Sequence, residues 1–117
     1  MIEVRDIQDF SDYLDTLLSQ TECDDIEFKS AAGGFPDSFW DTYSAFANTD
    51  GGTIVFGVKE KDGNFFLNGL TDAQIDKYKK DFWTNMNNRS TISCNLMKES
   101  DVVTTEYKGY KFMLFFV

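Results

Sequence analysis

The feature that most constrains the fold is a double-glycine turn followed at once by an apolar run. Residues 48–52 have the sequence NTDGG and end a helix-like segment, and residues 53–58 are almost wholly apolar up to the charged pair Lys59-Glu60. Adjacent glycines let a helix stop and the chain reverse direction. An apolar run without alternation predicts a strand covered on both faces, and Gly57 within it predicts close approach by a neighbouring element.

The same turn has an alternative role, because the backbone N–H groups of a glycine pair can hold a phosphate. Phosphate-binding loops normally follow a strand and precede a helix. Here a helix-like segment precedes the turn and a strand follows it. This order favours a structural turn between a helix and the central strand.

Hydrophobic periodicity along the rest of the chain predicts an α+β domain. Apolar residues at helical spacing predict helices over residues 6–20, about 36–48 and about 71–88; the last begins with TDAQ, which matches a capping box. Strands are predicted over residues 26–29, 53–58, 64–67, 102–107 and 110–117. This order predicts a mixed β-sheet packed by about three helices.

Length and charge limit the function classes. The chain has 117 residues, which suits a single domain over residues 1–117, and its net charge is −9. Residues 1–30 hold nine acidic and two basic residues, whereas residues 59–117 hold eight acidic and nine basic residues. The overall charge argues against non-specific affinity for phosphate backbones, so a nucleic-acid surface is expected in the second half or on another chain.

Several residue types are informative by their scarcity. There is no histidine, which excludes Ser-His-Asp and Cys-His catalysis. Cys23 and Cys94 form no CxxC pair, so the sequence indicates no zinc site and favours reduced thiols in the cytoplasm. No apolar run approaches the roughly 20 residues that span a bilayer, and no membrane partner is expected.

Three carboxylates are candidates for a metal centre. Glu22 precedes the first predicted strand, Glu27 lies within it, and Glu60 lies just past the central strand. If these strands are neighbours, the three side chains converge and offer the oxygen ligands that Mg²⁺ or Mn²⁺ accepts. Such an ion would activate water for phosphodiester hydrolysis. In a chain this acidic, three solvated surface carboxylates are the alternative.

Basic residues near aromatic residues are candidates for nucleic-acid binding. They are Lys29 of the first strand, Lys77 and Lys80 of the helix over 71–88, and Arg89 just beyond it. The alternative is an ordinary amphipathic helix with solvated lysines, since Asp72, Asp76 and Asp81 belong to the same segment.

The chain resembles the Schlafen AlbA-like family over about residues 20–117. The resemblance rests on Glu22, on EFK at 27–29, on SAFANTDGGTIVFGV at 44–58 and on NGL at 68–70. It implies an α+β fold and a DNA-binding domain of bacterial transcriptional-regulator-type proteins. Related animal domains cleave structured RNA with three acidic residues and a divalent metal. These positions correspond to Glu22, Glu27 and Glu60, although an Asp is more usual at the third and Lys59 stands where an acid is common.

Three functions are therefore expected, in this order. The first is a DNA-binding module without a required cofactor, with DNA preferred to RNA. The second is a Mg- or Mn-dependent endoribonuclease, and the third is an acidic protein-interaction module. The chain ends on the apolar run of residues 112–117, which predicts that this is the N-terminal module of a longer protein. A homo-oligomer is a further expectation.

Overall fold

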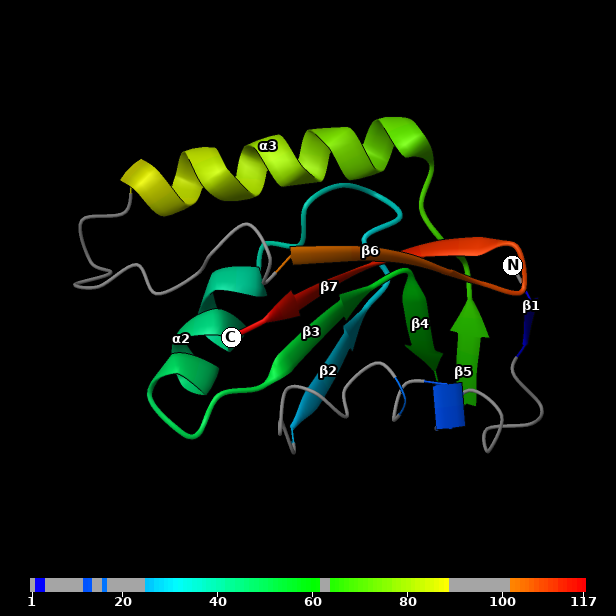
Figure 1. The fold of residues 1–117 in the computed structure, drawn as a ribbon, viewed down its shortest axis with the longest axis horizontal. Coiled ribbons are helices and arrows are strands. Elements are labelled where there is room, and N and C mark those ends of the chain that lie inside the picture. The colour runs from blue at the N-terminus through cyan, green and yellow to red at the C-terminus, as the bar shows by residue number, and fades with distance from the viewer. Residues whose placement is uncertain (1, 4–11, 14–15, 17–24, 62–63, 89–101) are drawn as a thin grey trace.

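A computed structural model describes residues 2–3, 12–13, 16, 25–61, 64–88 and 102–117 of the chain (Figure 1). The described part holds seven strands and two helices in mixed order. They are β1 (Ile2–Glu3), β2 (Ile26–Lys29), α2 (Phe39–Ala47), β3 (Thr53–Phe56), β4 (Val58–Lys61), β5 (Asn64–Leu67), α3 (Asp72–Asn88), β6 (Val102–Tyr107) and β7 (Tyr110–Phe116).

The strands form two sheets. The larger has the order β2-β3-β7-β6, in which β2 is parallel to β3 and the other pairs are antiparallel. The smaller is antiparallel, with the order β1-β5-β4. The predicted α+β class with a mixed sheet is confirmed. The predicted count of about three helices is not matched, because the described residues contain two; the helix expected over 6–20 lies largely outside them.

The predicted central strand is two strands in two sheets. β3 ends at Phe56 and β4 begins at Val58, and the chain changes sheet at Gly57, whose φ is 111°. A Cβ at this position would lie 2.6 Å from Cδ1 of Phe112, which confirms the close approach expected at Gly57. A continuous apolar pattern shows burial but cannot show to which sheet each residue belongs, and so the single-strand prediction was wrong.

Each face of the larger sheet is covered by its own hydrophobic cluster. Ile54, Phe56, Met113 and Phe115 belong to the cluster that includes Phe39, Tyr43, Ile75, Tyr78, Phe82 and Met86 of the two helices. Val55 and Leu114, which alternate with them, pack with Val58, Leu67 and Phe112. Successive strand residues point to opposite faces, which explains this division. The expectation that the strand is covered on both sides is confirmed.

The double-glycine turn joins α2 to β3 and uses its hydrogen bonds within the fold. The Gly51 N–H donates to the Phe46 carbonyl at 3.1 Å, and Gly52 exchanges two backbone hydrogen bonds with Val117. A Cβ at Gly51, whose φ is 94°, would lie 2.5 Å from the Val117 carbonyl oxygen. The turn is therefore a structural connection.

Thr53 at the start of β3 gives a first prediction. Its side chain is fully buried, and its hydroxyl has no hydrogen-bond partner in the part of the chain that is described. Because valine has nearly the same shape and no hydroxyl to desolvate, Thr53→Val is expected to raise the free energy of unfolding by about 1 kcal/mol. Urea denaturation checks this, with the exposed Thr104→Val of β6 as a control of small effect. If Thr53→Val lowered the free energy of unfolding, the conclusion that the Thr53 hydroxyl lacks a hydrogen-bond partner would be contradicted.

Candidate nucleic-acid interface

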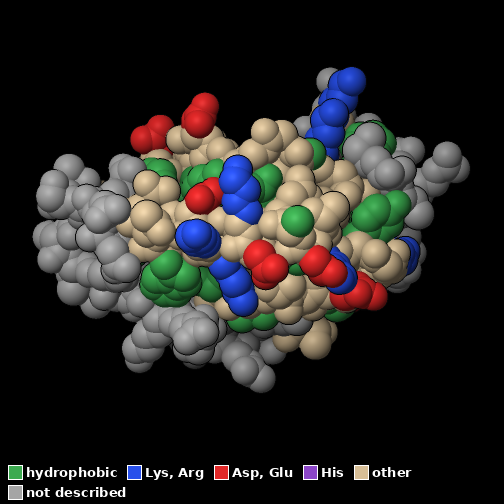
Figure 2. Space-filling model, turned by 90° about the horizontal axis from the view of Figure 1, so that it is seen from above, with side chains coloured by type: hydrophobic (Ala, Val, Ile, Leu, Met, Phe, Trp, Pro, Cys, Tyr) green, Lys and Arg blue, Asp and Glu red, His purple; other side chains and the backbone are tan. Residues whose placement is uncertain are grey.

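The exposed face of α3 carries charges of both signs. Figure 2 looks onto this side of the molecule and shows lysine and acidic side chains interleaved. Lys77, Lys79 and Lys80 are exposed. The aspartates of the same helix, which equal them in number, are Asp72, Asp76 and Asp81. The side chains of α3 therefore give no net positive charge in the described structure.

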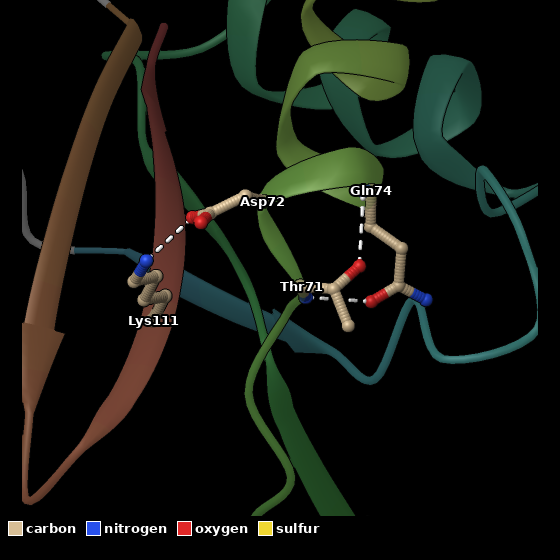
Figure 3. Close-up of polar contacts among 4 residues, drawn as sticks. All are labelled: Thr71, Asp72, Gln74 and Lys111. Carbon is tan, nitrogen blue, oxygen red and sulfur yellow. Dashed lines mark hydrogen bonds and ion pairs between the residues drawn. The ribbon is translucent and has the colours of Figure 1, made fainter.

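A capping box fixes the start of α3, as predicted (Figure 3). The Gln74 N–H donates to Thr71 Oγ1 at 3.1 Å, and the Thr71 N–H donates to Gln74 Oε1 at 2.9 Å. Two N–H groups that would otherwise lack partners at the first turn are thereby satisfied. The capping box and the buried stripe Ile75, Tyr78, Phe82 and Met86 together determine which residues of α3 face solvent.

Lys111 of β7 is paired with this helix. Its Nζ lies 2.5 Å from Asp72 Oδ1 at the first turn of α3 (Figure 3). The hydrogen bond to Asp72 raises the pKa of Lys111 above its usual range. The stability that this raised pKa contributes is present below the usual pKa of a lysine and is lost as the pH rises through the raised pKa. Because Lys111 already has a carboxylate partner, it is a poor candidate for contacting phosphate.

Lys29, the last residue of β2, lies at a pocket. The loop from Lys29 to Ser38 lines a volume of about 510 Å³. The half-buried Lys29 donates from Nζ to Ser38 Oγ at 2.9 Å. Among the described residues the one ion pair is that of Lys111 and Asp72, so Lys29 has no carboxylate partner there.

Hydrogen bonds hold this loop against α3. The Tyr78 hydroxyl donates to the Ala31 carbonyl at 2.6 Å, and Gln74 Nε2 donates to the Ala32 carbonyl at 3.3 Å. Burial is the main reason why the pKa of Tyr78 is raised. Lys77 lies between these two residues in the helix, so the structure brings the Lys29 loop and the Lys77 turn together. Lys80 lies about one turn further along α3.

A second, smaller pocket shares Ala32 with the first. It has a volume of about 260 Å³ and is lined by Ala32, by the Asn68–Thr71 segment and Gln74, and by Gly109 with the first two residues of β7. The sequence patterns indicated no site between the strand predicted over 26–29 and the helix predicted over about 36–48, and both pockets were missed. The available signal was Gly33-Gly34, four residues after Lys29. The last basic candidate, Arg89, lies outside the described residues.

The three candidate carboxylates are only partly described. Glu27 is exposed on β2, Glu22 lies outside the described residues, and for Glu60 only the backbone, within β4, is described. Glu60 belongs to the smaller sheet and follows the break at Gly57, rather than the end of a single central strand. In the ranges that the structure covers, no three Asp, Glu, His or Cys residues are grouped to hold a metal ion. The metal centre stays a prediction.

Comparisons with known proteins agree with this architecture. The family model described as Schlafen, AlbA_2 matches residues 22–112. A solution NMR structure of the N-terminal domain of a RecG-related protein from Nitrosomonas europaea is similar, with a TM-score of 0.62 and 28% sequence identity. The match covers 91% of this chain and 70% of that one.

One comparison and one property of the structure complete this description. Curated proteins give no significant match to this chain. Neither helix of the described structure is long and apolar enough to cross a membrane. The family match extends from just before β2 into β7 and includes both helices and the two pockets. The chain belongs to the Schlafen AlbA_2 family.

Proposed function

We propose that this domain binds nucleic acid, DNA in preference to RNA, as a module of a transcriptional-regulator-type protein of the bacterial cytoplasm. Family membership carries the proposal. The similar N-terminal domain supports it, because the name of that protein relates it to the ATP-dependent DNA helicase RecG. The surface proposed for contact joins the Lys29 loop to Lys77 and Lys80 of α3.

The charges on this surface predict the kind of binding. Each lysine that contacts a phosphate releases counterions, which makes affinity fall as salt rises. The lysines of α3 are balanced by aspartates on the same helix, and the chain has a net charge of −9. Binding through this surface is therefore expected to involve few phosphates and to be strongest at low salt.

A charge-reversal pair tests the surface. Lys77→Glu with Lys80→Glu is expected to weaken binding of duplex DNA at least tenfold, because two phosphate contacts become repulsive. Fluorescence anisotropy over a salt series measures this. The matched control is Lys59→Glu with Lys61→Glu on β4, which reverses two exposed lysines and changes the net charge equally. Equal losses in both double variants would assign the effect to overall charge and not to α3.

A second hypothesis is the metal-dependent endoribonuclease that uses Glu22, Glu27 and Glu60 with Mg²⁺ or Mn²⁺. One observation favours it: β4, which carries Glu60, starts beside the end of β2, where the Gly57 N–H donates to the Lys29 carbonyl at 2.9 Å. Incubation of labelled tRNA with and without Mn²⁺ tests it. Mn²⁺-dependent cleavage that is lost in Glu27→Gln would support a nuclease, and intact tRNA would remove it.

The third hypothesis is an acidic protein-interaction module, including self-association. The described residues of the Asp25–Asp50 segment support it, since they carry five acids and Lys29 as their only base. Sedimentation velocity distinguishes it from the leading proposal. Self-association together with no affinity for DNA would favour this hypothesis.

A further inference from the structure

We infer that the pocket lined by residues 29–38 is a subsite that takes one unstacked nucleotide of a single-stranded nucleic acid. This inference rests on the proposed function. In this subsite Lys29 contacts the phosphate and Phe35 stacks on the base. The pocket is open to solvent and has a volume of about 510 Å³.

Lys29 supplies the charge for a phosphate contact. Lys29 is partly buried as a residue, its ammonium group makes an exposed hydrogen bond, and it has no carboxylate partner among the residues that the structure describes. Its hydrogen bond to Ser38 Oγ places a hydroxyl beside it, so that two donors face one region of the pocket. An ammonium group without a carboxylate partner is available for a charge-assisted hydrogen bond to a phosphate.

Phe35 supplies a stacking surface that is held in place. Its ring is half-buried and lines the same pocket as Lys29. It forms T-shaped pairs with Phe39, Phe56 and Tyr78, with centroids 5.0, 5.6 and 6.0 Å away, and a stacked pair with Trp40 at 6.4 Å. Because the ring is already held by this packing, stacking a base on its exposed part costs little side-chain entropy. Such stacking has little sequence preference, since every base has an aromatic face.

The glycines between these two residues leave the backbone accessible. A Cβ built at Gly33 or Gly34 would meet no heavy atom within 4 Å, so the space beside the chain is open at both positions. At Gly51, Gly52, Gly57 and Gly69, by contrast, a Cβ would meet another atom at 2.9 Å or less. The open space at Gly33 and Gly34 lies along the pocket between Lys29 and Phe35.

The shape and charge of the pocket favour a single strand over a duplex. Its lining comes from ten consecutive residues, so it is a local hollow and not a groove across the molecule. A base can enter such a hollow only when it is unstacked from its neighbours, which costs least in a single strand. Asp37 lines the pocket, and Glu27 lies on the same face of β2 as Lys29. Both carboxylates repel phosphates, and this repulsion is stronger for the closely spaced phosphates of a duplex than for one isolated phosphate.

The experiment compares a labelled single-stranded DNA of about 12 nucleotides with the duplex of the same sequence, using the whole chain and fluorescence anisotropy. Wild type is expected to prefer the single strand. Lys29→Ala is expected to weaken single-strand binding about tenfold and to reduce the salt slope by about 0.7, as for one phosphate contact. Phe35→Leu is expected to weaken binding about tenfold without changing the slope, and Phe35→Tyr to retain affinity. Lys61→Ala removes one exposed lysine elsewhere and is the matched control.

Each result decides the inference. Wild-type affinity in both Lys29→Ala and Phe35→Leu would overturn the subsite and leave the proposed function standing. A duplex bound as tightly as the single strand would overturn the single-strand assignment. Wild type that binds neither DNA would overturn the proposed function itself. Circular dichroism checks that each variant is folded. If Phe35→Leu is not folded, the affinity and the salt slope of Lys29→Ala decide whether the subsite exists.

Discussion

Replacing Gly57 by alanine is expected to lower the free energy of unfolding by about 3 kcal/mol. Gly57 has a φ of 111°, where an L-residue is strained, and the added Cβ would lie 2.6 Å from Cδ1 of Phe112. The strain costs about 1–2 kcal/mol, and overpacking against a buried ring costs about as much again. Phe112 is almost fully buried, so its ring cannot move aside into solvent. Urea denaturation followed by circular dichroism measures the loss.

Gly33→Ala is the matched control for this prediction. A Cβ at Gly33 would meet nothing within 4 Å, and its φ lies outside the left-handed region. The substitution is therefore expected to leave stability unchanged or to raise it by a few tenths of a kcal/mol, because it restricts the unfolded chain. If the two variants lost similar stability, the close approach at the sheet change would not be the cause.

The second large effect is expected at Phe39 in α2. Phe39→Ala should lower the free energy of unfolding by about 4 kcal/mol, because its fully buried ring leaves a cavity at the centre of the helix–sheet cluster. The ring has aromatic neighbours from four parts of the fold: the preceding loop, α2 itself, α3 and the larger sheet. They are Phe35, Trp40, Tyr43, Phe56, Phe82 and Phe115.

Phe39→Leu separates the cavity from the loss of the ring. Leucine keeps most of the apolar volume, so this variant should lose about 1–2 kcal/mol when both are compared by urea denaturation. A loss in Phe39→Ala no larger than that in Phe39→Leu would show that the cluster collapses around the missing side chain. In that case the aromatic packing between α2 and α3 would contribute less than its geometry indicates.

Features that depend on a few consecutive residues could be predicted from the sequence. The strand Ile26–Lys29 and the capping box at Thr71 are where the local patterns placed them. The tight turn at Lys108-Gly109 joins β6 to β7, and both residues have the positive φ that such a turn requires. In each case the signal is a turn residue, a cap or a short alternation, which acts within one element.

Features that depend on pairing between distant segments could not be predicted. Periodicity does not say that β7 lies between β3 and β6, nor that the apolar run over 53–58 changes sheet at Gly57. The pocket at Lys29 depends on hydrogen bonds from Gln74 and Tyr78 to the loop, more than 40 residues away. The lysines of α3 could be proposed from the sequence, and their exposure follows from the buried stripe on the opposite side of the helix.

The strand order has a consequence for biosynthesis. β7 pairs with β3 on one side and with β6 on the other, so β3 has an unpaired edge until residues 110–116 have left the ribosome (Figure 1). During that interval β3 has only its edge toward β2 paired, and the buried side chains of Ile54 and Phe56 lack their β7 partners Phe115 and Met113. An open apolar strand edge is a template for pairing between chains. Among the stages at which this domain emerges, the nascent chain is therefore expected to be most prone to aggregation just before the β6–β7 hairpin appears.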